Sequence, residues 1–280
     1  MKAKKLTGRG IHVAVLDTGI YPHVDFEGRI LKFADFVSYK SQPYDENGHG
    51  THVCGILAGS GRGCHYQYRG CAPECGLVVA KVLDQYGNGK KEVILRAFQW
   101  LLYEYQRLGV RIVNISVGTT YNSPREQKGL LEGVDALWDA GLVVVAAAGN
   151  QGPTPGSVTA PGSSKKIITV GSSDMLTAHR DASGRGPTGE CVCKPDVVAP
   201  GYQVMSCIPS YDGKPAYGKK SGTSMSTPYV SGSIAQMLQK DPQLTNVEIK
   251  MLLRDSATDM GYPHNVQGWG LFDREKFLKF

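Results

Sequence analysis

The stretch "SGTSMSTP", residues 221–228, places five hydroxyl side chains before a proline. A serine hydroxyl becomes a good nucleophile only when a neighbouring base removes its proton, and that base needs a third group to fix its tautomer. A histidine and a carboxylate are the partners to look for. Such a trio would carry out acyl transfer, in which the serine oxygen attacks a carbonyl carbon.

Two of the seven histidines, His49 and His52, lie in the glycine-rich stretch "NGHGTHVCG", residues 47–55. Gly48 and Gly50 let other backbone segments approach His49 closely. Residues 51–57 predict a short buried helix, with His49 at its N-terminal entry and His52 one turn inside. A structural role is the alternative for either imidazole.

The best candidate carboxylate is Asp17 in "VLDTGI". It ends an apolar run, where an unpaired charge would be costly. The alternative is an aspartate that caps the turn formed by Thr18 and Gly19.

The elements that must position these groups alternate along the chain. Apolar runs rich in Val and Ile predict strands at 11–17, 76–83, 110–117, 141–149 and 166–171, with amphipathic helices at 90–109 and 125–141. Further helices are expected at about 225–240 and at 245–257, the last capped by Thr245 or Asn246. This order predicts an α/β fold, a doubly wound, mostly parallel sheet with helices on both faces. Ligand sites of such sheets lie at the carboxyl ends of the strands, where Asp17 is expected.

Composition narrows the class of protein. The 280 residues predict one domain, 1–280, and no apolar run approaches the roughly 20 residues of a membrane span. A net charge of +6 from dispersed lysines and arginines gives no basic stripe for nucleic acid. Seven cysteines fit reduced thiols in a cytosol better than a disulfide scaffold. Zinc held by Cys64, His65, Cys71 and Cys75, with the pair Cys191 and Cys193, is an alternative without a standard spacing.

Taken together, "VAVLDTGI", "NGHGTHVCGILAG" and "SGTSMSTPYVSG" stand in the order Asp, His, Ser. With "YRGCAPE", "AAAGN" and "KPDVVAPG", they make residues 10–270 resemble the subtilisin-like serine proteases, intracellular bacterial members above all. The resemblance implies a serine endopeptidase in which Ser224 is the nucleophile, His49 the general base and Asp17 its orienting group. It also implies that Asn150 donates a hydrogen bond to the oxyanion.

The resemblance further implies that a polypeptide substrate binds as an added strand between two short edges. The matching residues are Gly87, Asn88 and Gly89 on one edge and Ser116, Val117 and Gly118 on the other. Residues 116–118, together with Ala147, Ala148, Gly149 and the region around Thr159, would line the side-chain pocket. None of them is acidic, so broad specificity with an apolar preference is expected.

The sequence departs from the family pattern at two points that bear on the cofactor and on the cellular compartment. Asp25 matches an aspartate near the calcium site of secreted subtilisins, but the loop at 59–70 lacks their Asn-rich sequence. We therefore expect that no cofactor is needed for the chemistry and that calcium is not held strongly. No secretion signal precedes the first strand, which leads us to expect a cytoplasmic, bacterial-type enzyme. The sequence gives no oligomeric state.

The sequence also allows three rival interpretations. Asp17-Thr18-Gly19 is also the triplet of aspartic proteases, but the only possible second copy, Asp255-Ser256-Ala257, lies in an expected helix. "GKPAYGKK", residues 213–220, resembles a phosphate-binding loop, yet Lys220 replaces the required Ser or Thr. A catalytically silent scaffold that binds peptides or regulates a partner is the third alternative.

Overall fold

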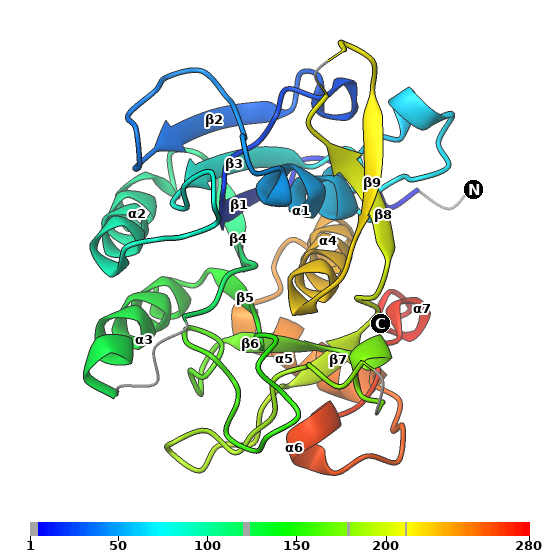
Figure 1. Ribbon diagram of the computed structural model, residues 1–280. Helices are drawn as coiled ribbons and strands as arrows, with labels where there is room; N and C mark the ends of the chain where they lie inside the picture. Colours follow the sequence, from blue (N-terminus) through cyan, green and yellow to red (C-terminus); the bar gives the residue numbers. More distant parts are fainter. Residues whose placement is uncertain (1–4, 120–123, 178–179, 211) are drawn as a thin grey trace.

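Seven strands of the described chain form one parallel sheet (Figure 1). The computed structural model describes residues 5–119, 124–177, 180–210 and 212–280. The spatial order of the strands is β2 (Ile30–Asp35), β3 (Gly76–Lys81), β1 (His12–Asp17), β4 (Val110–Ile115), β5 (Val143–Ala147), β6 (Ile168–Ser172) and β7 (Val197–Ala199). The central strands are buried along almost their whole length, as expected for a sheet covered on both faces.

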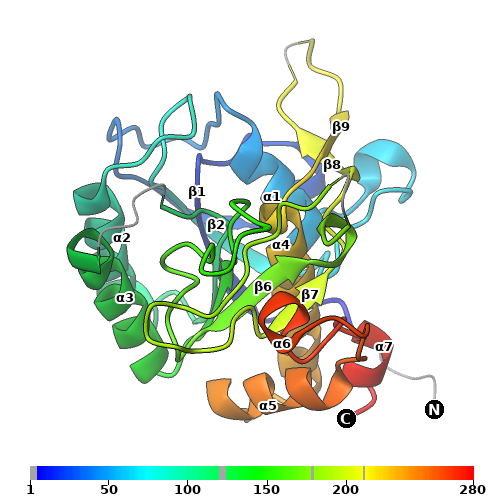
Figure 2. The same cartoon turned by 60° about the horizontal axis from the view of Figure 1, so that its bottom comes forward.

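In the described ranges, two pairs of helices cover the faces of this sheet. α2 (Lys91–Glu104) and α3 (Pro124–Asp139) pack together on one side, whereas α1 (His49–Ala58) and α4 (Thr223–Lys240) pack together on the other (Figure 1). Figure 2 shows α5 (Asn246–Ser256), α6 (His264–Gln267) and α7 (Arg274–Phe277) gathered near the C-terminus, with α5 against α7. Three short 3-10 turns, η1 (Val24–Phe26), η2 (Arg62–Cys64) and η3 (Ser173–Met175), lie in the loops. No helix in the described ranges is long and apolar enough to span a membrane.

The predicted α/β architecture is confirmed, as are the five predicted strands and the helices. The helix expected at 245–257 is α5, and Thr245 is its N-cap. The Thr245 hydroxyl accepts from the amide of Glu248, whose carboxylate accepts from the Thr245 amide, so both free donors are satisfied.

Four strands were not predicted from the sequence. β2 lies at the edge of the sheet and exposes Leu31 and Lys32, which breaks the continuous apolar pattern of a central strand. β7 has only three residues. The antiparallel hairpin of β8 (Val204–Ile208) and β9 (Ala216–Lys220) has no apolar run in its second strand.

The chain order of the strands reverses beside β1. From β1 the chain builds β2 and β3 on one side of the sheet, then crosses to add β4 to β7 on the other. Such a switch point opens a crevice at the carboxyl ends of the strands, where Asp17 ends β1. α1 and α4 both begin at this edge, with His49 and Thr223 as their first residues.

Candidate active site

Asp17 and His49 form a hydrogen-bonded pair at the end of β1. The Asp17 side chain is fully buried, and its Oδ1 accepts from His49 Nδ1 at 2.7 Å and from the Thr18 amide at 2.7 Å. Because Nδ1 donates to Asp17, a neutral imidazole carries its proton on Nδ1, and Nε2 is free to take another. The imidazole is a quarter exposed, so substrate can reach it.

The surroundings of His49 favour its charged form. Burial lowers the pKa of His49, but the charge of Asp17 and its hydrogen bond outweigh this, so the net shift is upward. An imidazole tuned in this way holds a transferred proton well, which is what a general base requires.

His52 is a structural histidine. It is fully buried, and its Nε2 lies 3.0 Å from the carbonyl oxygens of both Val204 and Gly218 on the β8–β9 hairpin. Burial lowers the pKa of His52 to about 4, so it stays neutral near pH 7. The structural role that is the alternative for either imidazole therefore applies to His52.

Ser224 is the second residue of α4. Its hydroxyl donates to the carbonyl oxygen of Ser116 at 2.7 Å, and among the described residues it makes no hydrogen bond to His49. Two of the three groups of the predicted trio are thus linked directly, and the serine is held by the neighbouring strand end. A rotation about the Cα–Cβ bond of Ser224 would release its hydroxyl from Ser116.

The start of α4 is shaped by Gly222, its N-cap. Gly222 has φ of 143°, a conformation that other residues rarely adopt, and a side chain there would press on the Asn150 amide. Pro228 lies in the second turn of the helix, where its missing N–H leaves the carbonyl of Ser224 without the usual partner. In the first turn the Met225 amide donates to the Gly222 carbonyl at 2.9 Å, whereas the Ser224 amide has no partner in the described part of the chain and is available to an anion.

Asn150 is fixed against the same helix end. Its Oδ1 accepts from the Thr223 amide at 2.9 Å and from the Thr223 hydroxyl at 3.2 Å. Because the backbone amide can only donate, the side-chain oxygen of Asn150 must face it and the NH₂ group must point away. Asn150 is thereby oriented as a hydrogen-bond donor beside Ser224.

A cleft of about 890 Å³ brings most of the predicted substrate-binding residues together. Its lining includes His49 and both predicted edges, residues 87–89 and 116–118. The Asp84 carboxylate shapes the first edge by accepting from the amides of Tyr86 and Asn88, each at 2.9 Å. Ala148 and Gly149 do not line this cleft, and Ala148 is fully buried.

Thr159 lies between the two strand ends that were expected to form the side-chain pocket. A methyl group added at Gly118 or at Gly149 would collide with the Thr159 hydroxyl. That hydroxyl is buried and has no partner in the described part of the chain. Thr159 therefore limits the space between these strands and presents an unused hydrogen-bonding group there.

Sequence reasoning missed Asp45, a buried residue four positions before His49. Its carboxylate binds Thr18 and the first turn of α1. The available signal was an acidic residue just before a helix whose N-cap is a glycine, where a capping carboxylate is favourable.

Asp25, the residue expected near a calcium site, is surrounded by hydrogen-bond donors. Its carboxylate accepts from the amides of Gly61 at 3.0 Å and Gly63 at 2.9 Å and from the hydroxyl of Tyr217 at 3.0 Å. Calcium needs oxygen ligands directed at the ion. Amide and hydroxyl donors in those positions do not fit it.

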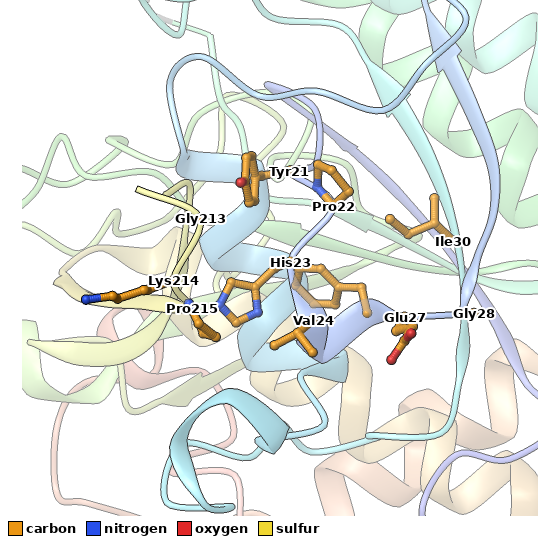
Figure 3. A pocket seen from close by; sticks show the side chains of 11 residues that line it. Tyr21, Pro22, His23, Val24, Glu27, Gly28, Ile30, Gly213, Lys214 and Pro215 are labelled. Atoms are coloured by element: carbon orange, nitrogen blue, oxygen red, sulfur yellow. The ribbon is translucent and has the colours of Figure 1, made fainter. Parts of the chain in front are cut away.

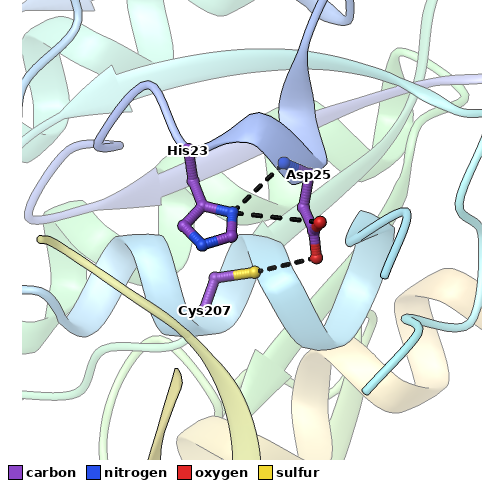
Figure 4. Close-up of side chains that lie close together, drawn as sticks. All are labelled: His23, Asp25 and Cys207. Atoms are coloured by element: carbon purple, nitrogen blue, oxygen red, sulfur yellow. Dashed lines mark hydrogen bonds and ion pairs between the residues drawn. The ribbon is translucent and has the colours of Figure 1, made fainter. Parts of the chain in front are cut away.

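His23, Asp25 and Cys207 form a buried cluster whose potential metal ligands lie within 4.8 Å of one another (Figure 4). His23 Nδ1 accepts from the Asp25 amide, and the Cys207 thiol lies 3.5 Å from the Asp25 carboxylate. Burial and the nearby carboxylate raise the pKa of the Cys207 thiol, which keeps its proton. These contacts account for the arrangement of the three side chains within the cluster.

A second cavity of about 480 Å³ lies beside η1 (Figure 3). Tyr21, His23, Glu27 and Ile30 line it together with residues 213–215 from the turn between β8 and β9. It shares no lining residue with the cleft at His49.

The sequence model of the Subtilase family matches residues 8–270. The chain belongs to the subtilase family. It is 43% identical over 296 residues to the serine protease AprX of Bacillus subtilis (strain 168), covering 96% of this chain and 66% of AprX. It is 36% identical over 270 residues to Subtilisin Savinase of Lederbergia lenta, covering 96% of this chain and 91% of that protein.

Solved structures of other proteins have the same fold. "S41 Psychrophilic Protease" has a TM-score of 0.82 and 29% identity, covering 95% of this chain and 92% of its own. "Sphericase" has a TM-score of 0.80 and 27% identity, covering 97% and 94%. The predicted family, the subtilisin-like fold and the serine-protease class are confirmed by these matches. The chain spans just under two thirds of the length of AprX.

Proposed function

We propose that this subtilase is an endopeptidase that cleaves polypeptides through an acyl-enzyme formed on Ser224. The observation that carries the proposal is the 2.7 Å hydrogen bond between buried Asp17 and His49, at the edge of the sheet where α4 presents Ser224. Family membership supports the reaction class.

In the proposed reaction, Ser224 turns from Ser116 towards His49, which takes the hydroxyl proton at Nε2 as the serine oxygen attacks the peptide carbonyl. The resulting oxyanion accepts hydrogen bonds from the Asn150 NH₂ group and from the Ser224 amide. As the carbon–nitrogen bond breaks, His49 gives its proton to the leaving amine. Water then attacks the ester with His49 again acting as base, and Ser224 regains its proton.

We propose that the substrate lies extended along residues 87–89 and 116–118. Main-chain hydrogen bonds to two such edges bind peptides of many sequences, which supports broad specificity. Thr159 supports a preference for small or medium apolar side chains at the cleaved position, because it restricts the space beside Gly118 and Gly149.

We also propose that the enzyme works in a reducing compartment, such as the cytoplasm, and without calcium bound at Asp25. All seven cysteines are free thiols, and the exposed pair Cys191 and Cys193 would be open to oxidation elsewhere. The donors around Asp25 support the second point. An unchanged melting temperature when calcium replaces EDTA is expected, and a clear rise with calcium would contradict it.

Labelling with a fluorophosphonate tests the proposed reaction, because the probe loses fluoride only to an activated serine. We expect one adduct, located by mass spectrometry on the peptide that contains Ser224, and none in Ser224→Ala. His49→Ala should slow labelling by several orders of magnitude. Adducts of equal yield in wild type and Ser224→Ala would refute the assignment.

The same experiment addresses the silent-scaffold alternative, which the hydrogen bond from Ser224 to Ser116 favours. A protein that binds peptides in the cleft but is never labelled would be a scaffold rather than an enzyme.

A further inference from the structure

Asp45 contacts both segments that carry the Asp17–His49 pair. Its side chain is buried, with only 4% of the residue exposed. Oδ1 accepts from the Thr18 hydroxyl at 2.8 Å and from the Gly48 amide at 2.9 Å. Oδ2 accepts from the amide of Thr51 at 2.8 Å and from its hydroxyl at 2.6 Å.

These contacts are made to residues one or two positions from Asp17 or His49. Thr18 follows Asp17, and its amide donates to the same Asp17 oxygen that binds His49. The Thr18 hydroxyl also accepts from the amide of Gly50 at 2.9 Å, just beyond His49. Asp45 and Thr18 together thus tie the end of β1 to the start of α1.

Asp45 also supplies a cap that α1 lacks locally. The helix begins at His49 after Gly48, which has φ of 82° and no side chain to cap the free amides. The Asp45 carboxylate accepts from the Thr51 amide in the first turn, and its negative charge is favourable at a helix N-terminus. The direction of the first turn determines where the His49 imidazole lies.

We propose that Asp45 is a positioning residue for peptide hydrolysis. By binding Thr18 and the first turn of α1 at the same time, it holds Asp17 and His49 in the correct position relative to each other. The inference rests on the proposed function of the Asp17–His49–Ser224 trio. Asp45 does not touch the reacting atoms and acts through the groups that it binds. A displacement of about 1 Å at a catalytic group can cost about 100-fold in rate.

The charge of Asp45 gives the proposal a second readout. Burial lowers the pKa of His49, whereas the charges of Asp17 and, more weakly, Asp45 raise it. Lys220 on β9 opposes them, and His52 lies one turn along α1. Removing the Asp45 charge should therefore lower the pKa of His49.

The test compares Asp45→Asn with a matched control, Asp35→Asn. Asp35 is also buried, and its carboxylate accepts four hydrogen bonds, from the amides of residues 37, 38 and 40 and from the Tyr44 hydroxyl, none of which touches the trio. For Asp45→Asn we expect kcat on a peptide amide to fall about 10- to 100-fold with little change in KM. The acid limb of its pH–rate profile should also move to lower pH. Asp35→Asn should keep the wild-type pH–rate profile even if its melting temperature falls as far as that of Asp45→Asn.

Thr18→Val separates positioning from charge, and it serves if Asp45→Asn does not fold. It removes the hydroxyl that joins Asp45 to Thr18 but leaves the Asp45 carboxylate in place, so kcat should fall while the acid limb stays near its wild-type position. A normal kcat and pH profile in both Asp45→Asn and Thr18→Val would overturn the inference. Absence of fluorophosphonate labelling in the wild type would instead overturn the proposed function.

Discussion

The Asp17 carboxylate and the His49 imidazole lie 2.7 Å apart, although they are 32 positions apart in the sequence. Asp17 is held at the end of a buried strand, and His49 is held at the start of a helix that packs against the same sheet. Neither group can move far without disturbing the core. The pair is therefore organised before substrate arrives, which is the condition for efficient proton transfer.

The pH dependence of activity should follow from this pair. Because the net effect of burial and Asp17 raises the pKa of His49, the acid limb of kcat/KM should have its midpoint above about 6.5. Activity rises through this pH range as the imidazole loses its proton and becomes a base. The dependence of kcat/KM on pH is measured with a peptide amide as substrate. A midpoint of the acid limb clearly below pH 6.5 would contradict the prediction.

Asp17→Asn should reduce kcat by about 10⁴-fold, since the amide can stabilise the wrong tautomer of the imidazole. It should also lower the pKa of His49, because burial would act without the opposing charge. NMR titration of the imidazole in a Ser224→Ala background, with and without Asp17→Asn, measures this shift free of self-digestion. An unchanged His49 pKa would show that Asp17 does not set it.

Asn150→Ala should reduce kcat by about 100- to 1,000-fold with little change in KM, as expected for a donor that binds the oxyanion only in the transition state. Asn150 also accepts from Thr223, so its loss could act through the helix start instead. Asn150→Asp separates the two effects, because a carboxylate keeps the acceptor but lacks the N–H donor. If Asn150→Asp retained wild-type kcat, the helix contact rather than the donor would be responsible.

The sequence predicted the parts of the fold that have a strong local pattern. Continuous apolar runs indicated the central strands, and three- and four-residue spacing indicated the long helices. β2 escaped because an edge strand mixes exposed Leu31 and Lys32 with buried positions. β9 escaped because "AYGKK" has neither an apolar run nor alternation. β2 and β9 are strands because they pair with β3 and β8, not because of a pattern in their own residues.

The catalytic candidates could be predicted because each lies in a short, distinctive segment. Contacts between segments that are distant in the sequence could not be predicted. The Ser224 hydroxyl binds Ser116, 108 positions away, and Asp45 binds Thr18, 27 positions away. Aspartates before a glycine-rich turn are common, and only the folded chain brings this one to both catalytic segments.

Thr159→Ala should widen the pocket beside Gly118 and Gly149 and shift selectivity towards large side chains. Removing the hydroxyl and methyl groups frees space between the two strand ends, so kcat/KM for a Phe peptide should rise about 10-fold relative to an Ala peptide. Thr159→Val is the matched control, because it keeps the size and removes only the hydroxyl. Selectivity is measured as the ratio of kcat/KM for the Phe peptide to that for the Ala peptide. An equal shift of this ratio in Thr159→Val and Thr159→Ala would contradict the prediction.

Stability should depend on pH through Lys194, which is fully buried between β6 and β7. Its ammonium group donates to Asp196 at 2.6 Å and to the Ile167 carbonyl at 2.9 Å, with Lys250 on the other side of the same carboxylate. Burial, opposed by Asp196 and reinforced by Lys250, lowers the pKa of Lys194 to about 8. In the unfolded chain a lysine titrates near about 10.4.

The folded state therefore binds the Lys194 proton less tightly than the unfolded state does, so stability should rise as pH increases from about 8 to about 10.4 and be flat below 8. The rise is at most about 3 kcal/mol, because one pKa unit corresponds to about 1.4 kcal/mol. Guanidinium unfolding of Ser224→Ala, with and without Lys194→Met, measures it without self-digestion. Because other groups titrate in this range, the difference between the two curves is the quantity that reports Lys194. A difference that stays constant from pH 7.5 to 10.5 would show that Lys194 does not contribute.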